Sequence, residues 1–300
     1  MSPETVVSIV TPSFQSGRFI ERTIKSVLTQ DYPHIEYIVM DGGSTDETLS
    51  ILKRYRGRLQ YVSAPDNGAA DAINRGFLKS TGAIFGWLNA DDYYLPGAVR
   101  AAVRQLEADP EAVVVYGEAL WIDEQNRELG RYPTVTPYRP DMWRHECSIC
   151  QPAAFIRHDA FAGVGMLDRN LHFAFDYDLW IRLAAAGRFT AIPDTLAASR
   201  MHAASKTLGG RRLVFEENIA VLQKHFHYVP VNWVYGYLSF LRDGRDQYLA
   251  PLRHSPALYL ASLVMGSRYN YRHLWRYWRE WASRITPTTF RKLLSSNQSS

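Results

Sequence analysis

The 300-residue sequence has little cysteine and no long hydrophobic run, and each absence removes a class of protein. Its only cysteines, Cys147 and Cys150, are too few for a disulfide framework or a four-ligand zinc site, so we expect two reduced thiols, with a redox or metal role as the alternative. The longest nearly uncharged apolar stretch, residues 255–267, is far shorter than the roughly 20 residues that cross a bilayer. The first residues lack the features of a signal peptide. We therefore expect a cytoplasmic chain without a transmembrane segment.

Strand-like and helix-like segments alternate through the first 120 residues. Short β-branched runs are separated by stretches whose apolar side chains have helical spacing. The expected strands are residues 6–10, 35–40, 59–62, 84–88 and 113–116. Strands separated by helices form βαβ units, so the pattern predicts an α/β fold with a mostly parallel sheet covered by helices on both faces. Further along, we expect connecting loops at 121–149, a helix at 178–186, and short strands at 189–192 and 197–201.

Polar residues follow the expected strands, at the edge where sheets of this kind bind ligands. The four segments are 11–14, 41–44, 66–68 and 89–92, and three of them carry aspartate. Carboxylates that share one edge repel each other unless a cation or ligand hydroxyls lie among them. Asp91 and Asp92 suit Mg²⁺ or Mn²⁺, which prefer oxygen ligands, but they equally suit a helix N-cap ahead of Pro96. Asp41 is not needed for a cap and can accept a hydrogen bond from a base or a ribose.

The order and spacing of these segments resemble the inverting glycosyltransferases of family 2. The matching segments are Val7–Phe14, Ser26–Gln30, Tyr37–Asp46, Asp66–Gly68, Asp71–Gly76, Gly82–Asp92 and Phe175–Leu183. The resemblance implies the GT-A fold, which is Rossmann-like. It also implies a hexosyltransferase-type enzyme that moves a sugar from a nucleoside-diphosphate sugar, with UDP as the first expectation, to an acceptor hydroxyl. Relatives of this kind imply a role in cell-surface polysaccharide or glycolipid assembly.

The resemblance also implies roles for individual residues. The nucleotide sugar would be contacted by Thr11, Pro12, Ser13, Asp41, Gly42, Asp66, Asn74 and Asp91. Mn²⁺ or Mg²⁺ would be held by Asp91, Asp92 and His202, and the sequence does not decide which aspartate contacts the ion directly. Asp176 matches the general base that takes the proton of the acceptor hydroxyl. Asp178 is expected to cap the helix that follows.

Two positions depart from the family's pattern. Asn89 stands where the acidic motif usually begins with aspartate, which weakens a ribose contact rather than metal binding. Ile73 stands where a phosphate-facing arginine is usual, and Asp71 or Arg75 is the expected compensation. Processive relatives carry a Gln-x-x-Arg-Trp motif and membrane helices, and this sequence has neither, so we expect transfer of one sugar at a time.

Two other functions remain as alternatives. One is a nucleotide-sugar-binding protein that has lost catalysis, although intact Asp91, Asp92 and Asp176 argue against it. The other is a sugar nucleotidyltransferase, but the glycine-rich, arginine-containing loop of that class is absent after the first strand. The product distinguishes them, because a nucleotidyltransferase releases pyrophosphate and a glycosyltransferase releases a nucleoside diphosphate.

The composition changes near residue 209, where tryptophan, tyrosine and arginine become frequent. We expect a catalytic domain at 1–208, with a nucleotide-sugar half at about 1–120 and an acceptor half at about 121–208. Residues 209–300 are expected to form a helical, aromatic and basic region.

The stretch 271–285 reads as an amphipathic helix with Leu274, Trp278, Trp281 and Ile285 on one face. A basic helix with tryptophan on its apolar face is typical of a helix at a membrane interface, and packing against the catalytic domain or a second subunit is the alternative. We therefore expect residues 250–292 to contact the inner face of a membrane, where a glycan or lipid-linked acceptor would lie. No nucleic-acid-binding motif accompanies the basic residues, and an oligomer remains open.

Overall fold

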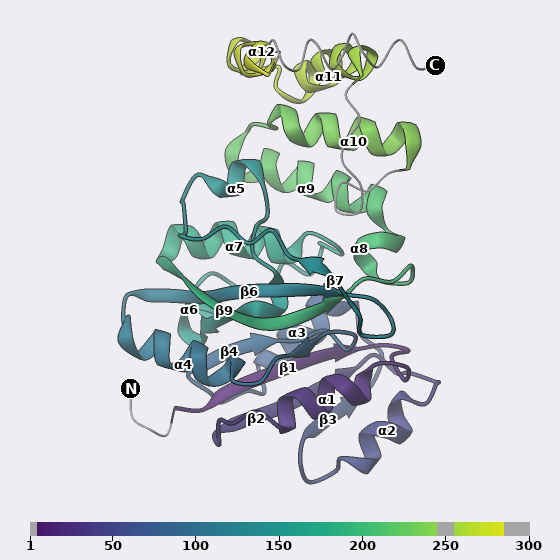
Figure 1. Ribbon diagram of the computed structural model, residues 1–300, viewed down its shortest axis with the longest axis vertical. Helices are drawn as coiled ribbons and strands as arrows, with labels where there is room; N and C mark the ends of the chain where they lie inside the picture. The colour runs from purple at the N-terminus through teal and green to yellow at the C-terminus, as the bar shows by residue number, and fades with distance from the viewer. Residues whose placement is uncertain (1–4, 245–254, 285–300) are drawn as a thin grey trace. The chain divides into compact units, whose positions relative to one another are not determined.

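The structure is a computed structural model that describes residues 5–244 and 255–284 (Figure 1). It divides into two compact units. The first consists of Met1–Pro140 and Cys147–Ala203, and the second of Asp141–Glu146 and Ala204–Ser300. The expected helix end at Ile285 and the flanks of the basic stretch, 250–254 and 285–292, lie outside the described residues.

Four parallel strands form the first half of the sheet, in the order β3-β2-β1-β4. Their bounds are β1 Val7–Ser13, β2 Ile35–Asp41, β3 Gln60–Ser63 and β4 Ile84–Trp87. All of β1 is buried because it lies inside the sheet with helices on both faces. Its register pairs Ser13 with Asp41, so two predicted site residues end side by side at the carboxyl edge. The predicted α/β fold is confirmed.

The second half of the sheet adds antiparallel strands, so the complete sheet is mixed. Strand β8 (Ala154–Arg157) lies between β4 and β6 (Ala112–Ile122) and is antiparallel to both. Strand β9 (Arg188–Arg200) is parallel to β6. Two short strands, β5 (Tyr93–Tyr94) and β7 (Glu128–Arg131), are antiparallel to β9 and β6 respectively.

Two sequence expectations are corrected in this half. The stretch expected to be loops, 121–149, contains β7 and the short helix α5 (Met142–His145). The two short strands expected at 189–192 and 197–201 are one strand, β9. Its pairing with β6 shifts register opposite Gly117, which has no side chain, so the chain passes Pro193 by a bulge instead of ending there.

Helices cover both faces of the sheet (Figure 1). One face carries α1 (Ile20–Leu28), α2 (Thr48–Arg54) and α4 (Ala98–Ala108), and the other carries α3 (Ala69–Phe77), α6 (His158–Gly163) and α7 (Phe175–Ala186). Helix α1 buries Ile20, Thr23, Ile24 and Val27, the spacing of one helical face. Helix α3 approaches β1 so closely that a Cβ on Gly76 would lie 2.5 Å from a Val10 methyl group.

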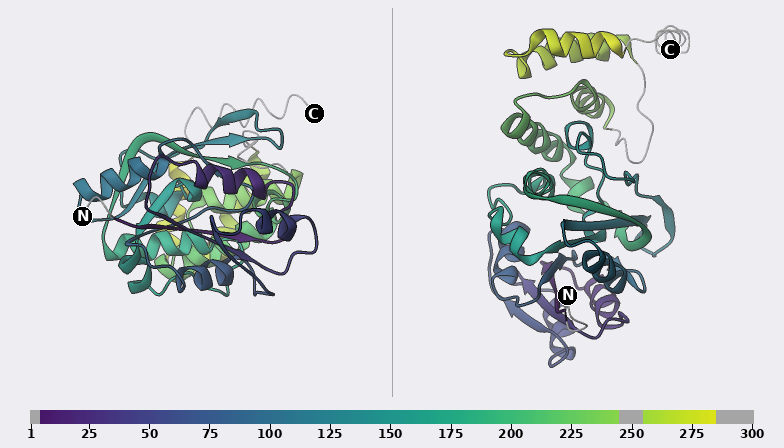
Figure 2. Two further views of the ribbon diagram at one scale, coloured as in Figure 1. Left: turned by 90° about the horizontal axis from the view of Figure 1, so that it is seen from below. Right: turned by 90° about the vertical axis from the view of Figure 1, so that its left-hand side faces the viewer.

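The second unit is helical. It contains α5, α8 (Lys206–Gly209), α9 (Arg211–Phe226), α10 (Val231–Asp243), α11 (Pro256–Tyr269) and α12 (Leu274–Ser283). Helix α10 packs on α9 and α11, and α11 packs on α12 (Figure 2). Of the helices that the structure describes, none has the length and apolar character needed to cross a bilayer.

The face of α12 that was expected to be apolar, with Leu274, Trp278 and Trp281, is partly exposed and partly packed on α11. Tyr277 is its fully buried residue, and its hydroxyl donates to the Ser262 carbonyl at 2.8 Å. Trp281 is half-buried and donates to the Tyr259 carbonyl at 2.9 Å. Trp278 is exposed at the edge of the contact, as the expectation of a membrane-facing side chain requires. The inward-facing residue Tyr277 was not singled out in the sequence, because no local pattern reveals that Gly266 of α11 leaves space for its ring.

Candidate active site

The strand ends bring the predicted nucleotide residues to one edge of the first unit. Thr11 and Ser13 lie at the end of β1 and are buried. The Thr11 hydroxyl is 3.1 Å from the Tyr37 hydroxyl, whereas the buried Ser13 hydroxyl has no hydrogen-bond partner among the described residues. A buried hydroxyl without a partner is costly, so Ser13 has the property of a group that a ligand satisfies. Pro12, between them, is also buried.

Asp41 is held by its own loop. Its carboxylate accepts from the Ser44 hydroxyl and amide, the Gly43 amide and the Ser63 hydroxyl, at 2.5–3.2 Å. The side chain therefore shapes the β2 loop, and any ligand contact of Asp41 is additional to these bonds.

Gly42 and Asp66 meet beside the exposed ring of Phe14. A Cβ on Gly42 would lie 2.9 Å from the Asp66 carboxylate and 3.3 Å from the Phe14 ring, so a larger residue there would displace the Asp66 side chain. Asp66 accepts from the Gly68 amide at 2.8 Å, which leaves its other carboxylate oxygen facing Gly42. The β2 and β3 loops are thereby closely packed, as expected of a site for a flat ligand.

Asn74 is placed differently from its expected position at the nucleotide. Its amide nitrogen donates to the Leu167 carbonyl at 2.9 Å, and its amide oxygen accepts from the Leu167 amide at 3.1 Å. Asn74 is buried, and both of its side-chain polar atoms form these hydrogen bonds, which join α3 to the loop before α7. This correction follows from a fold contact 93 residues away in sequence, which no local motif reveals.

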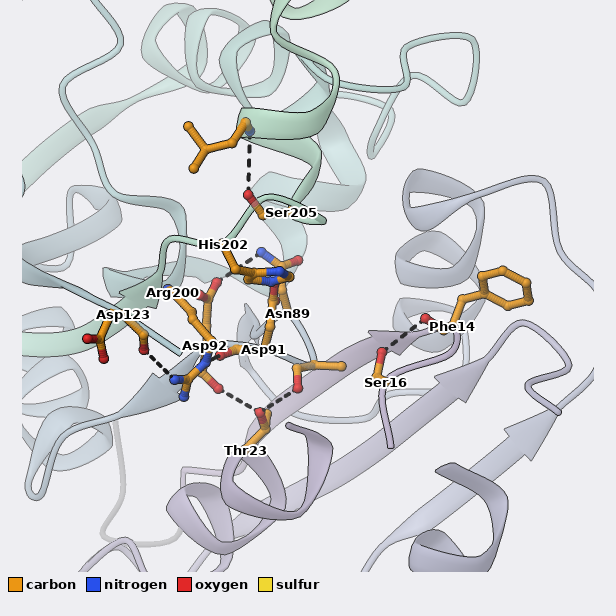
Figure 3. Close-up of polar contacts among 12 residues, drawn as sticks. Phe14, Ser16, Thr23, Asn89, Asp91, Asp92, Asp123, Arg200, His202 and Ser205 are labelled. Atoms are coloured by element: carbon orange, nitrogen blue, oxygen red, sulfur yellow. Dashed lines mark hydrogen bonds and ion pairs between the residues drawn. The ribbon is translucent and has the colours of Figure 1, made fainter. Parts of the chain in front are cut away.

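Asp92 is buried and is hydrogen-bonded on both carboxylate oxygens. One accepts from the Arg200 amide at 2.8 Å, and the other from the Asn89 side chain at 3.1 Å (Figure 3). Burial, reinforced by the charge of Asp91, raises the pKa of the Asp92 carboxyl to about 8, although its hydrogen bonds act to lower the pKa. Because both oxygens of Asp92 are enclosed, its side chain serves to position residues 89–92. It is less suited to binding an ion.

The contacts of Asn89 show why asparagine replaces the family's usual aspartate at this position. Its amide group donates to Asp92 and, at 3.2 Å, to the Gln151 side-chain oxygen. Gln151 is fixed in turn by donating to the Trp87 carbonyl at 2.7 Å. A carboxylate at position 89 would face two acceptors, so an amide suits this chain better.

Asp91 is the more accessible aspartate of the motif and lies against His202. Its carboxylate is 3.0 Å from His202 Nε2, and about a quarter of its side chain is exposed (Figure 3). The His202 ring also contacts Phe19, with centroids 5.0 Å apart. Strand β9 creates the pair, because its pairing with β5 brings residues 198–202 alongside the motif. The structure thus brings together two of the three predicted metal ligands.

Arg200 holds the loop of Asp91 in place. It is a positioning residue that no sequence motif identified. Its buried guanidinium donates to the Asp91 and Asp123 carbonyls and to the Asn126 side chain, at 2.7–2.9 Å. These acceptors occupy the guanidinium, which ties the Asp91 loop to the turn at 123–126. Thr23 adds a second tie from α1, since its hydroxyl lies 2.9 Å from the Ala90 carbonyl and 2.7 Å from that of Asp92.

Asp176 lies in the first turn of α7 and is half-buried. One of its carboxylate oxygens accepts from the Tyr177 amide at 2.7 Å. Asp178 is fully buried and pairs with Arg182 at 2.7 Å, so its expected role as a helix cap is replaced by an ion pair one turn along. Burial raises the pKa of the Cys150 thiol, and the charges of Asp92 and Asp176 raise it further.

Asp71 and Arg75, the expected compensation for Ile73, pair with each other. Asp71 is buried and its carboxylate is 2.7 Å from Arg75 and 3.4 Å from Arg169. Arg169 is a basic residue at this edge that the sequence reading missed, because it belongs to no motif. Its side chain is two-thirds exposed and remains accessible to an anion.

The ligand atoms of Asp91 and His202 fit a divalent cation whose remaining ligands come from outside the protein. Among the residues that the structure describes, no three His, Cys, Asp or Glu side chains form a metal cluster. The Asp91 carboxylate and the His202 ring nitrogen, 3.0 Å apart, would be the side chains that hold such an ion. Mg²⁺ and Mn²⁺ are commonly held by one or two side chains together with phosphate oxygens and water.

The fold and the acidic motif define a GT-A class protein, and comparisons with known proteins agree. The sequence pattern described as "Glycosyl transferase family 2" matches residues 8–164, more than half of the chain. The chain belongs to glycosyl transferase family 2.

The relatives extend beyond the length of this chain. An uncharacterized glycosyltransferase of Rickettsia prowazekii is 28% identical over 67% of this chain and 66% of its own length. A chondroitin synthase of Escherichia coli is 26% identical over 62% of this chain and 28% of its own length. This chain thus spans less than two thirds of these relatives.

Solved structures share the fold. TarS of S. aureus in complex with UDP superposes with a TM-score of 0.56, 17% identity, and 91% of each chain covered. The mannosyltransferase PcManGT of Pyrobaculum calidifontis, in complex with GDP-Man and Mn²⁺, has a TM-score of 0.56 and 20% identity, over 99% of this chain and 81% of that one.

Proposed function

We propose that the protein is a divalent-metal-dependent, inverting glycosyltransferase that moves one sugar at a time from a nucleoside-diphosphate sugar to an acceptor hydroxyl. The observation that carries the proposal is the Asp91–His202 pair at the carboxyl edge of the sheet, in a chain of glycosyl transferase family 2. The same edge carries the buried, unsatisfied Ser13 hydroxyl and the Asp66–Gly42 contact. The Ser13 hydroxyl and the Asp66 carboxylate support a site for the base and ribose of a nucleotide, beside the Asp91–His202 pair that would face its diphosphate.

UDP is the proposed nucleotide and Mn²⁺ or Mg²⁺ the proposed ion. The fold neighbours were solved with UDP and with GDP-Man and Mn²⁺, and their likeness supports a nucleotide-sugar donor of this general kind. When bound between Asp91, His202 and the diphosphate, the ion would supply Lewis-acid stabilisation of the leaving group. The second carboxylate, Asp92, keeps Asp91 in place through the backbone and does not bind the ion in this proposal.

Asp176 is the proposed general base. As the acceptor oxygen forms its bond to the anomeric carbon, the bond from that carbon to the diphosphate oxygen breaks on the opposite face. The acceptor's proton passes to the Asp176 carboxylate, so charge and atoms balance and the anomeric configuration inverts. The carboxylate at the first turn of α7 is half-buried, which leaves it open to an acceptor while water is limited.

The acceptor is proposed to be a glycan or a lipid-linked saccharide of the cell surface. The chondroitin synthase among the relatives supports a role in polysaccharide assembly. The donor sugar and the linkage are for the assay to identify.

The test separates donor binding from transfer. The full chain is titrated with UDP and with GDP by calorimetry, with Mn²⁺ and with EDTA, and is then incubated with a panel of nucleotide sugars while nucleoside diphosphate release is followed. We expect tight binding that needs Mn²⁺, and Mn²⁺-dependent release. Asp176→Asn should keep nucleotide binding and lose release by about 100-fold or more, the scale of a general base.

Asp159→Asn is the matched control, because Asp159 is an exposed carboxylate on α6 that accepts from its neighbouring amide. It should leave both binding and release unchanged. Retained release in a folded Asp176→Asn variant would contradict the assignment of the base. Binding without release from any donor would instead indicate a nucleotide-sugar-binding protein, and pyrophosphate release a nucleotidyltransferase.

A further inference from the structure

The outer surface of α11 and α12 displays large apolar side chains to solvent. Leu260 and Val264 on α11 are each more than half exposed, as is Tyr271 in the connecting turn. Trp275 on α12 is 82% exposed, and Trp278 is also exposed. Tryptophan is rarely left in water to this extent unless it has a partner.

These side chains form one continuous surface. The Trp275 and Trp278 rings meet edge to face with centroids 5.5 Å apart. The Trp278 indole nitrogen donates to the Ser267 hydroxyl at 2.9 Å, which joins α12 to α11. Ser267 lies one helical turn beyond Val264, and Val264 lies one turn beyond Leu260. We call Leu260, Val264, Tyr271, Trp275 and Trp278 the apolar surface of the helix pair.

The helix pair is a folded platform and not a loose segment. Tyr277 is completely buried against Gly266, where a Cβ would lie 1.9 Å from its ring. Asn270 closes the turn between the helices, because its side chain bonds to both the amide and the carbonyl of Val229 at 2.8–2.9 Å. The exposed tryptophans therefore lie on the side opposite a well-packed interior, and the interior does not need them.

The charges around the apolar surface are of one sign. Residues 255–284 carry five arginines, which are Arg268, Arg272, Arg276, Arg279 and Arg284, and all of them are exposed. Their only acidic residue is Glu280. Its carboxylate turns inward and accepts from the Tyr228 hydroxyl at 2.6 Å and the Val231 amide at 3.1 Å. Arg284 pairs with Glu280 at 3.7 Å and Arg276 lies over the Tyr228 ring, so Arg268, Arg272 and Arg279 are the exposed cations left beside the apolar surface.

We propose that the apolar surface of the helix pair binds the interface of an anionic phospholipid bilayer. Tryptophan and tyrosine favour the headgroup level of a membrane, and exposed arginines favour anionic headgroups. Charge complementarity favours lipid over a second copy of this chain, because two copies meeting through this surface would bring their arginines together. The binding is peripheral, through side chains that enter the interface from one face of the pair.

The experiment is vesicle flotation of the full chain, with phosphatidylcholine vesicles and with phosphatidylcholine vesicles that contain phosphatidylglycerol. We expect the protein to float with the anionic vesicles, to float far less with the neutral ones, and to be released as NaCl rises. Trp275→Ala should lower the partition coefficient about tenfold. Arg272→Gln and Arg279→Gln should lower it about fivefold each.

Two control variants match these changes elsewhere. Leu129→Ala removes an exposed apolar side chain from β7, and Arg104→Gln removes an exposed arginine from α4, so both should float like wild type. Circular dichroism confirms that each variant is folded. Nucleoside diphosphate release by Trp275→Ala should equal that of wild type, so that failure of this proposal and failure of the proposed function are read separately.

Three results would overturn the proposal. The first is absence of flotation with anionic vesicles at low salt. The second is a folded Trp275→Ala variant that floats like wild type. The third is a monomer–dimer equilibrium in sedimentation that Trp275→Ala abolishes while vesicles bind neither protein, because the surface would then belong to a second copy.

Discussion

Replacing each motif aspartate by asparagine should produce two opposite phenotypes. Asp91 exposes part of its carboxylate and faces His202 at 3.0 Å, whereas Asp92 is enclosed and accepts hydrogen bonds on both oxygens. We expect Asp91→Asn to lose Mn²⁺ and keep its stability. We expect Asp92→Asn to lose stability and keep most of its affinity for Mn²⁺.

The magnitudes follow from these contacts. Asp91→Asn removes one of two protein ligands, so its loss should reach at least the 10–100-fold that an outer-shell partner causes, or about 1.4–2.7 kcal/mol. In Asp92→Asn, the new amide group must face either the Asn89 amide group or the Arg200 amide, and two donors then oppose each other. An unmade buried hydrogen bond of this kind costs about 1–3 kcal/mol. Each kcal/mol lowers the Tm of a domain of this size by roughly 2–4 °C.

The assay measures Mn²⁺ affinity by calorimetry in the presence of UDP, and Tm by circular dichroism, for both variants. The swap Asn89→Asp with Asp92→Asn restores a donor–acceptor pair between the two positions and should recover part of the lost Tm. The account is refuted if Asp92→Asn loses Mn²⁺ as completely as Asp91→Asn at unchanged Tm, because Asp92 would then be the metal ligand.

Three further predictions concern stability. Asn74→Ala should lower the free energy of unfolding by about 1–3 kcal/mol in urea titrations, because it leaves the Leu167 backbone groups unsatisfied, and unchanged stability would contradict the Asn74–Leu167 hydrogen bonds. Gly266→Ala should cost about 1–3 kcal/mol or more, because its Cβ overlaps the Tyr277 ring, whereas Ala at the open Gly163 should cost little. Burial of Asp71 raises its pKa, but hydrogen bonding and its two arginine partners outweigh this and hold the pKa below its ordinary value of 3.8. A depressed pKa gives stability that is present at neutral pH and is lost as the pH falls below about 4, so wild type should lose more stability than Asp71→Asn between pH 5 and 3 in acid titrations.

The sequence was a good guide to the parallel half of the fold. Its strands are short β-branched runs with helices between them, and local periodicity is enough to find such elements. The antiparallel additions were harder. Strand β5 is only two residues long, and β8 and β7 depend on pairing with distant partners that no local pattern shows.

The position of a site residue was predictable where its motif lies at a strand end. It was unpredictable where a contact between distant parts of the chain fixes the side chain. Asp91 and His202 were expected to meet, and the structure places them together. The commitment of Asn74 to Leu167 and of Arg200 to the Asp91 loop depends on residues about 100 positions apart in sequence. From sequence alone, a polar side chain that bonds to a distant part of the fold cannot be distinguished from one that contacts a ligand.

The most direct test of the central claim is the product formed from a nucleotide sugar with Mn²⁺ present. The account predicts a nucleoside diphosphate, released only with the divalent ion and lost in both Asp91→Asn and Asp176→Asn, while Asp159→Asn releases it at the wild-type rate. Release of pyrophosphate, or release that persists at the wild-type rate in EDTA, would contradict it.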